Sequence, residues 1–152
     1  MKRTLILNAT IVNEGQQLNG SVVIEGEKIA EVLTNGRQPS VPVDTVIDAD
    51  GYYLLPGVID DHVHFRDPGL THKADIFTES CAAVAGGVTS IMDMPNTNPA
   101  TVTLEALEEK MALLAEKSLV NYSCYFGATN DNYTDFDKLD PHRVCGIKLF
   151  MG

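Results

Sequence analysis

Apolar and polar positions alternate in short runs through the first third of the chain, which is typical of β-strands. Five such runs are predicted as strands: 5–12, 21–25, 28–33, 45–48 and 52–55. Glu25-Gly26-Glu27 predicts a hairpin between two of them, because glycine supplies the positive φ that tight turns require. Residues 39–42 predict a loop. Residues 1–55 are therefore predicted to form an N-terminal β unit, which at about 55 residues is expected to pack against another part of the protein.

From Pro56 onward the hydrophobic period changes, and strand-like runs alternate with helical ones. The predicted strands cover 58–64, 90–94, 121–127 and 146–150, and the predicted helices cover 75–85 and 104–117. This order is typical of a parallel sheet that is covered by helices. In such folds the ligands bind at the carboxyl ends of the strands, where His64, Asn96 and Lys148 are expected.

Each predicted helix carries its own start or stop signal. Gly86-Gly87 ends the first helix, and Thr103 is a suitable N-cap for the second. Acidic residues come early in the second helix and Lys117 comes late, as the helix dipole favours. The apolar positions at helical spacing are Phe77, Cys81 and Val84 in the first helix, and Leu104, Leu107, Met111 and Leu114 in the second.

Two histidines stand at the end of the first strand after Pro56. Because strand side chains alternate, one face is predicted to hold Val58, Asp60, His62 and His64, and the other Ile59, Val63 and Phe65. Two imidazoles on one face can hold a single cation through neutral ring nitrogens, as in zinc sites. Asp60 is expected to orient one imidazole as a hydrogen-bond acceptor. A bare His-x-His pair also arises by accident at polar strand ends, so the spacing alone leaves both interpretations open.

Lys148 lies between two apolar residues of the last predicted strand. If Ile147 and Leu149 face the covering helices, Lys148 points the other way, into the interior of the sheet or barrel. An unpaired ammonium group there would be costly. A neutral amine could instead add carbon dioxide to give a carbamate, whose two oxygens suit the bridging of two cations. The alternatives are a carboxylate partner or a side chain that reaches solvent.

The composition excludes several classes of partner. The 152 residues are 44% hydrophobic and carry a formal net charge of −10, so without a basic cluster neither nucleic acid nor an anionic membrane is expected to bind. No apolar run approaches the roughly 20 residues that span a bilayer, and no signal-peptide pattern is present, so we expect a cytoplasmic protein. Three cysteines without close spacing are expected to be core residues rather than disulfide partners.

Four longer motifs follow one another along the chain: His62-Val63-His64-Phe65-Arg66-Asp67-Pro68-Gly69, Ala85-Gly86-Gly87-Val88-Thr89, Asp93-Met94-Pro95-Asn96-Thr97-Asn98-Pro99 and Gly146-Ile147-Lys148-Leu149-Phe150. In this order they resemble the signatures of the amidohydrolase superfamily and, within it, of dihydroorotase. The resemblance implies an α/β fold, a metal-dependent-hydrolase TIM (β/α)8 barrel. Residues 56–152 would hold only the first four or so β/α units, and residues 1–55 would be part of a composite β-sandwich.

The resemblance also implies roles for five residues. His62 and His64 match the pair that binds the first of two zinc ions, and Lys148 matches the lysine that bridges both ions as a carbamate. Arg66 and Asn96 match the residues that bind the substrate carboxylate. The physics agrees, because a guanidinium reads a carboxylate through two parallel hydrogen bonds and an amide adds another donor. A surface salt bridge for Arg66 and a turn residue for Asn96 are the alternatives.

The implied reaction is the reversible hydrolysis of (S)-dihydroorotate to N-carbamoyl-L-aspartate in de novo pyrimidine biosynthesis. Hydantoinases and allantoinases are similar, but they usually lack the arginine two residues after the second histidine. Arg66, together with Met94-Pro95-Asn96-Thr97, therefore favours dihydroorotase. The resemblance further implies a homodimer and an association with a transcarbamoylase.

Several parts of such an enzyme have no counterpart in these 152 residues. An eight-stranded barrel needs about 250 residues, and the family's two further histidines and its proton-shuttling aspartate come from later strands. No catalytic aspartate is therefore assigned, and His72 and His142 are expected to be ordinary polar residues in loops. We expect an N-terminal portion or a truncated relative that is inactive alone. A non-catalytic scaffold subunit is the alternative, and the presence of all five motif residues disfavours it.

Overall fold

The computed structural model describes residues 1–151, and the chain divides into two compact units. The first unit runs from Met1 to Pro56, and the second begins at Gly57. None of the described helices is long and apolar enough to cross a membrane.

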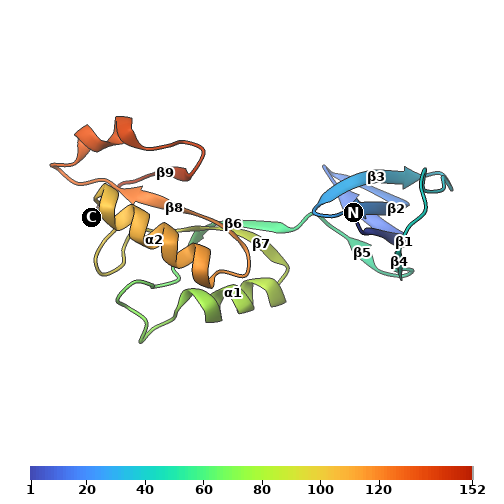
Figure 1. Ribbon diagram of the computed structural model, residues 1–152, viewed down its shortest axis with the longest axis horizontal. Coiled ribbons are helices and arrows are strands. Elements are labelled where there is room, and N and C mark those ends of the chain that lie inside the picture. Colours follow the sequence, from blue (N-terminus) through green and yellow to red (C-terminus); the bar gives the residue numbers. More distant parts are fainter. Residues whose placement is uncertain (152) are drawn as a thin grey trace. The chain divides into compact units, whose positions relative to one another are not determined.

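The first unit is a five-stranded mixed sheet (Figure 1). Its strands are β1 (Arg3–Asn13), β2 (Gln16–Glu25), β3 (Lys28–Thr34), β4 (Thr45–Asp48) and β5 (Tyr53–Leu54). The order is β3-β2-β1-β4, and β5 also pairs with β1; β2 is antiparallel to its neighbours, whereas β4 and β5 run parallel to β1. Gly26 has a φ of 62°, which confirms the predicted hairpin between β2 and β3. Leu5, Val23 and Leu33 form the core of this unit.

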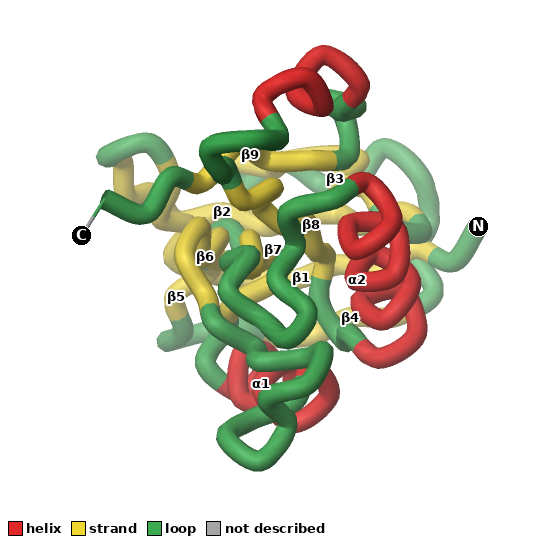
Figure 2. Tube along the Cα trace, turned by 90° about the vertical axis from the view of Figure 1, so that its left-hand side faces the viewer, coloured by secondary structure: helices red, strands yellow, loops and turns green. Residues whose placement is uncertain are grey.

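The second unit is a parallel sheet in the order β6-β7-β8-β9. Its elements are β6 (Val58–Val63), α1 (Ile76–Ala85), β7 (Val88–Asp93), α2 (Leu104–Lys117), β8 (Asn121–Gly127), the 3-10 helix η1 (Tyr133–Lys138) and β9 (Val144–Lys148). Both α-helices pack on the same side of this sheet (Figures 1 and 2). The predicted alternation of strand and helix is confirmed, although β9 begins at Val144 and ends at Lys148 rather than Phe150.

The core of the second unit lies between the sheet and the two helices. Its buried residues come from every strand or adjoining loop and from both helices: Phe65, Ile76, Ile91, Leu107, Leu114, Val120, Cys124, Phe126 and Val144. Leu104 and Met111 pack against this cluster, so the predicted apolar face of α2 is confirmed. Burial raises the pKa of the Cys124 thiol to about 12, while Cys81 and Cys145 are only half-buried.

The predicted apolar face of α1 is wrong by one residue. Phe77 and Val84 are 53% and 51% exposed, whereas Ile76 and Ser80 are buried. A shift of one residue rotates a helix by about 100°. Ser80 can face the core because its hydroxyl donates to the Phe77 carbonyl and accepts from the Leu119 amide, at 2.9 and 3.2 Å. A polar residue whose hydrogen bonds are satisfied in this way is tolerated in a core.

The prediction that Ile147 lies on the helix side of the last strand and Lys148 on the other side is confirmed, whereas Leu149 lies outside the strand. Ile147 pairs in register with the buried Phe126 and so lies on the helix-covered face of the sheet. It is nevertheless 46% exposed, and Leu149 lies beyond the end of β9 and is exposed. Within residues 1–151, no helix follows β9 to cover this edge of the sheet.

Candidate metal and carboxylate site

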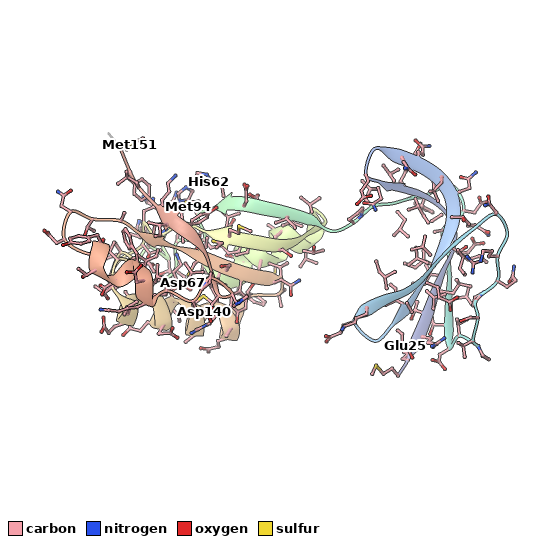
Figure 3. All side chains as sticks on the ribbon, turned by 90° about the horizontal axis from the view of Figure 1, so that it is seen from above. Glu25, His62, Asp67, Met94, Asp140 and Met151 are labelled. Carbon is pink, nitrogen blue, oxygen red and sulfur yellow. The ribbon has the colours of Figure 1, made fainter. Side chains whose placement is uncertain are left out.

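His62 lies near the carboxyl end of β6 (Figure 3), and His64 follows directly after this strand. Their ring centroids are 5.4 Å apart and the ring planes are inclined by 51°. Two imidazoles that bind one tetrahedral cation at about 2.0–2.1 Å would place their centroids roughly 5 Å apart. The separation of the two rings is therefore close to that of two imidazoles on one metal ion.

Asp60 does not orient an imidazole, contrary to the expectation from the alternating pattern. The pairing of β6 with β7 shifts between Asp60 and Val63, as at a β-bulge, so strict alternation of side chains fails there. Asp60 pairs with Ile91, and its carboxylate accepts the backbone N–H of His62 at 3.2 Å. The carboxylate therefore shapes the backbone at His62 rather than holding a ring.

His64 instead finds its partner at the end of the neighbouring strand. Its Nδ1 lies 2.8 Å from Oδ1 of Asn96, which follows β7. When Nδ1 carries the proton and donates to this oxygen, Nε2 keeps its lone pair and is free to bind a metal ion. The amide nitrogen of Asn96 then remains a donor for a ligand. The sequence suggested both residues for the site, but it did not suggest this contact between them.

Backbone contacts join the loop after β6 to the loop after β7. The amide of Met94 donates to the Val63 carbonyl at 2.9 Å, and the amide of Asn98 donates to the Pro68 carbonyl at 3.1 Å. Gly69, with a φ of 79°, lies so close to Asn98 that a Cβ atom would collide with the Asn98 carbonyl oxygen. The two loops that carry His64 and Asn96 thus form one packed layer.

A buried ion pair under this layer was missed by the sequence reasoning. Asp93 and Lys110 are both 0% exposed, and Nζ of Lys110 lies 2.8 Å from Oδ2 of Asp93 and donates to the Met94 carbonyl at 2.6 Å. Oδ1 of Asp93 accepts the amides of Phe65 and Met94, at 2.9 and 3.0 Å. The pair therefore connects α2 to the ends of both β6 and β7. One signal was available, because Lys110 falls between Leu107 and Leu114 on the apolar stripe of α2.

Arg66 lies in the same loop as His64, in a left-handed conformation with a φ of 70°. Within the described chain its guanidinium forms no ion pair. The next residue, Asp67, is almost fully buried and pairs with Lys117 at 2.7 Å. Arg66 thus lies two residues after His64, in the loop that follows β6.

Lys148 lies farther along the sheet, at the end of β9. It pairs in register with Gly127 next to the helix-facing pair Phe126 and Ile147, which puts it on the opposite face of the sheet. Its Nζ lies 5.3 Å from the centroid of the Phe150 ring. The described residues hold no cluster of three or more His, Cys, Asp or Glu side chains that could bind a metal ion. The structure therefore brings His62, His64 and Asn96 together but shows no contact between them and Lys148.

The two remaining histidines stand apart from this site. His72 and His142 are both exposed and lie in turns, and their assignment as ordinary polar residues stays a prediction.

The sequence of this chain matches a family model and the sequences of known enzymes. The family model described as Dihydro-orotase-like matches residues 51–143. A dihydroorotase of Methanosarcina acetivorans is 40% identical over 145 residues, which are 95% of this chain and 30% of that protein. An allantoinase of Deinococcus radiodurans is 38% identical over 148 residues, 97% of this chain and 32% of that protein.

Solved structures show the same fold. An L-hydantoinase (dihydropyrimidinase) from Arthrobacter aurescens has a TM-score of 0.88 at 28% identity and is matched over 97% of this chain and 32% of its own. A dihydropyrimidinase from Brevibacillus agri has a TM-score of 0.82 at 29% identity, over 99% of this chain and 33% of its own. The chain therefore spans about a third of the length of the relatives it matches. The predicted fold class is confirmed: the second unit holds the first four strands of a (β/α)8 amidohydrolase barrel, and a small β unit precedes it.

Proposed function

Because this chain belongs to the dihydro-orotase-like family of cyclic amide hydrolases, we propose that it forms part of a dihydroorotase. The reaction would be the reversible hydrolysis of (S)-dihydroorotate to N-carbamoyl-L-aspartate in pyrimidine biosynthesis. The proposal is supported by the contact between Asn96 and His64 at 2.8 Å and by the position of Arg66 two residues after His64 in the same loop. A ring that bears a carboxylate needs a cation and donors at that place, whereas an uncharged ring does not.

A second candidate is the hydrolysis of a cyclic amide without a carboxylate. It is favoured by the likeness to an allantoinase in sequence and to hydantoinases in structure. These relatives share the fold, and fold alone does not decide the substrate. The two candidates differ in what Arg66 does, because only a carboxylate-bearing ring would use its charge.

We propose that His62 and His64 hold the first of two zinc ions, and that Lys148, as a carbamate, contributes to both ions in the complete enzyme. Zinc bound there would supply Lewis acidity toward the ring carbonyl and would lower the pKa of a bound water. Asn96 would fix the tautomer of His64 through the contact at 2.8 Å, and its amide nitrogen would donate to the substrate. Arg66 would bind the substrate carboxylate with two parallel hydrogen bonds and so orient the ring.

We also propose that the 152-residue chain by itself does not hydrolyse dihydroorotate. Two histidines and one lysine cannot fill two zinc coordination spheres, each of which usually has four ligands. The homodimer, the transcarbamoylase partner and the cytoplasmic location that the resemblance implies stay predictions.

Replacement of Arg66 tests the choice between the two candidates. In the native-length protein, Arg66→Met should raise KM for dihydroorotate by about 10–100-fold, since a charge-assisted hydrogen bond contributes about 1.5–3 kcal/mol. The same change should leave any turnover of uncharged dihydrouracil unaltered. Arg143→Met is the matched control, because Arg143 is an exposed arginine that pairs with Glu108 outside the site. Equal losses for both rings would contradict the assignment of Arg66, and a preference for dihydrouracil would favour the second candidate.

A further inference from the structure

The loop that carries Arg66 is held by an ion pair at the next residue, Asp67, and the proposed reaction does not use this ion pair. Oδ2 of Asp67 lies 2.7 Å from Nζ of Lys117, the last residue of α2. The Asp67 side chain is 6% exposed, although a free carboxylate normally faces water. The hydrogen bond to Asp67 is the main cause that raises the pKa of Lys117 above its ordinary value.

Arg66 needs such support because of its backbone conformation. A φ of 70° costs energy in any residue with a Cβ atom, and such conformations persist only where the surroundings hold them. On one side, Phe65 is fixed by its buried ring and by the hydrogen bond that its backbone N–H donates to the Asp93 carboxylate. On the other side, Asp67 is fixed by Lys117, and the Leu70 amide donates to the Arg66 carbonyl at 3.1 Å.

Both anchors lead to the same helix. Lys110 holds Asp93, and Lys117 holds Asp67, and the two lysines are seven residues apart on α2. Seven residues make about two helical turns, so both side chains leave the same face of α2. The helix therefore carries two lysines, one buried and one half-exposed. Through Asp93 and Asp67 they hold the residues on either side of Arg66 in the chain.

We propose that Asp67 and Lys117 are positioning residues for Arg66, and that they set the preference for a ring that bears a carboxylate. The identity of this ligand rests on the proposed function, whereas the hold on the Arg66 backbone does not. A guanidinium can form two parallel hydrogen bonds only when its plane matches that of the carboxylate. A loop that loses one anchor would let the guanidinium sample other directions, so carboxylate binding would weaken before chemistry does.

A structural measurement tests the hold without any substrate. In the native-length protein, amide hydrogen exchange at Leu70 and Asn98 should speed up about tenfold in Lys117→Met, because loss of a charge-assisted bond favours local opening. Lys138→Met is the matched control, since Lys138 also pairs with an aspartate at 2.7 Å but lies in η1, away from the loop. Unchanged exchange at Leu70 and Asn98 in Lys117→Met would overturn the proposal.

Kinetics then separate positioning from a general structural role. Lys117→Met and Asp67→Asn should each raise KM for dihydroorotate about tenfold, because carboxylate binding weakens. In both variants kcat should stay within about twofold of the parent value, and the zinc content should not change. Lys117→Arg should restore the KM of the parent protein. KM for dihydrouracil should not change. Equal losses for both rings, or loss of zinc, would overturn the positioning role. If the parent protein does not hydrolyse dihydroorotate, the proposed function fails, and the exchange measurement alone decides whether Asp67 and Lys117 hold Arg66.

Discussion

Removal of the buried cation Lys110 should destabilise the second unit more than any surface change. Lys110→Met keeps the length and apolar body of the side chain but leaves the Asp93 carboxylate without a cation at a place with no exposure. It also removes the donor to the Met94 carbonyl. Breaking a buried pair from one side costs about 3–5 kcal/mol, which at about 1.4 kcal/mol per tenfold lowers the folding equilibrium constant by more than 100-fold.

Urea unfolding followed by circular dichroism at the helical band measures this loss, because both α-helices belong to the second unit. The double variant Asp93→Asn with Lys110→Met is the informative companion. An asparagine oxygen can still accept the amides of Phe65 and Met94, and no unpaired charge is left, so most of the stability should return. Arg143→Met breaks only an exposed pair and should leave the midpoint almost unchanged.

Hydrogen exchange at Phe65 and Met94 gives the local view of the same change. Both amides should lose protection in Lys110→Met, because the Asp93 carboxylate that accepts them is no longer fixed. This account of the Asp93–Lys110 pair would be refuted if Lys110→Met changed the free energy of unfolding by less than about 1 kcal/mol and left the amides of Phe65 and Met94 protected.

Three further predictions concern single positions. Gly69→Ala should lower the free energy of unfolding by at least about 1–2 kcal/mol from its left-handed φ alone. It should also weaken dihydroorotate binding, since the new Cβ atom would collide with Asn98. An unchanged urea midpoint and an unchanged KM would contradict this prediction. Thr103→Ala removes the N-cap that accepts the Ala106 amide and should cost about 1 kcal/mol in urea unfolding, whereas Thr103→Ser should cost little. Burial raises the pKa of Cys124 to about 12 and also raises that of Cys145, so iodoacetamide at pH 8 should label Cys81 first; mass spectrometry that found Cys124 labelled first would contradict its burial.

Features that depend on nearby residues could be predicted from the sequence. Thr103 and the apolar stripe of Leu107 and Leu114 defined α2 with the right start, because capping and periodicity act within a few residues. The histidine pair was found for a similar reason, since residues two positions apart in the chain lie near each other.

Features that depend on distant partners could not be predicted in this way. The buried face of α1 depends on the hydrogen bond that the Leu119 amide donates to the Ser80 hydroxyl, and these two residues are far apart in the sequence. The ion pair of Lys110 could not be identified from the sequence, because its partner Asp93 is on another element. The irregular pairing after Asp60 comes from the match between β6 and β7, which no single strand reveals.

The most direct test of the central claim is the ratio of kcat/KM for dihydroorotate to that for dihydrouracil, measured on the zinc-loaded, native-length protein. A site built around Arg66 and Asn96 should prefer the carboxylate-bearing ring by at least about 100-fold, because a site built to bind a group discriminates against a ring that lacks it. A ratio near or below one would contradict the carboxylate site and would make the protein a hydrolase of uncharged cyclic amides.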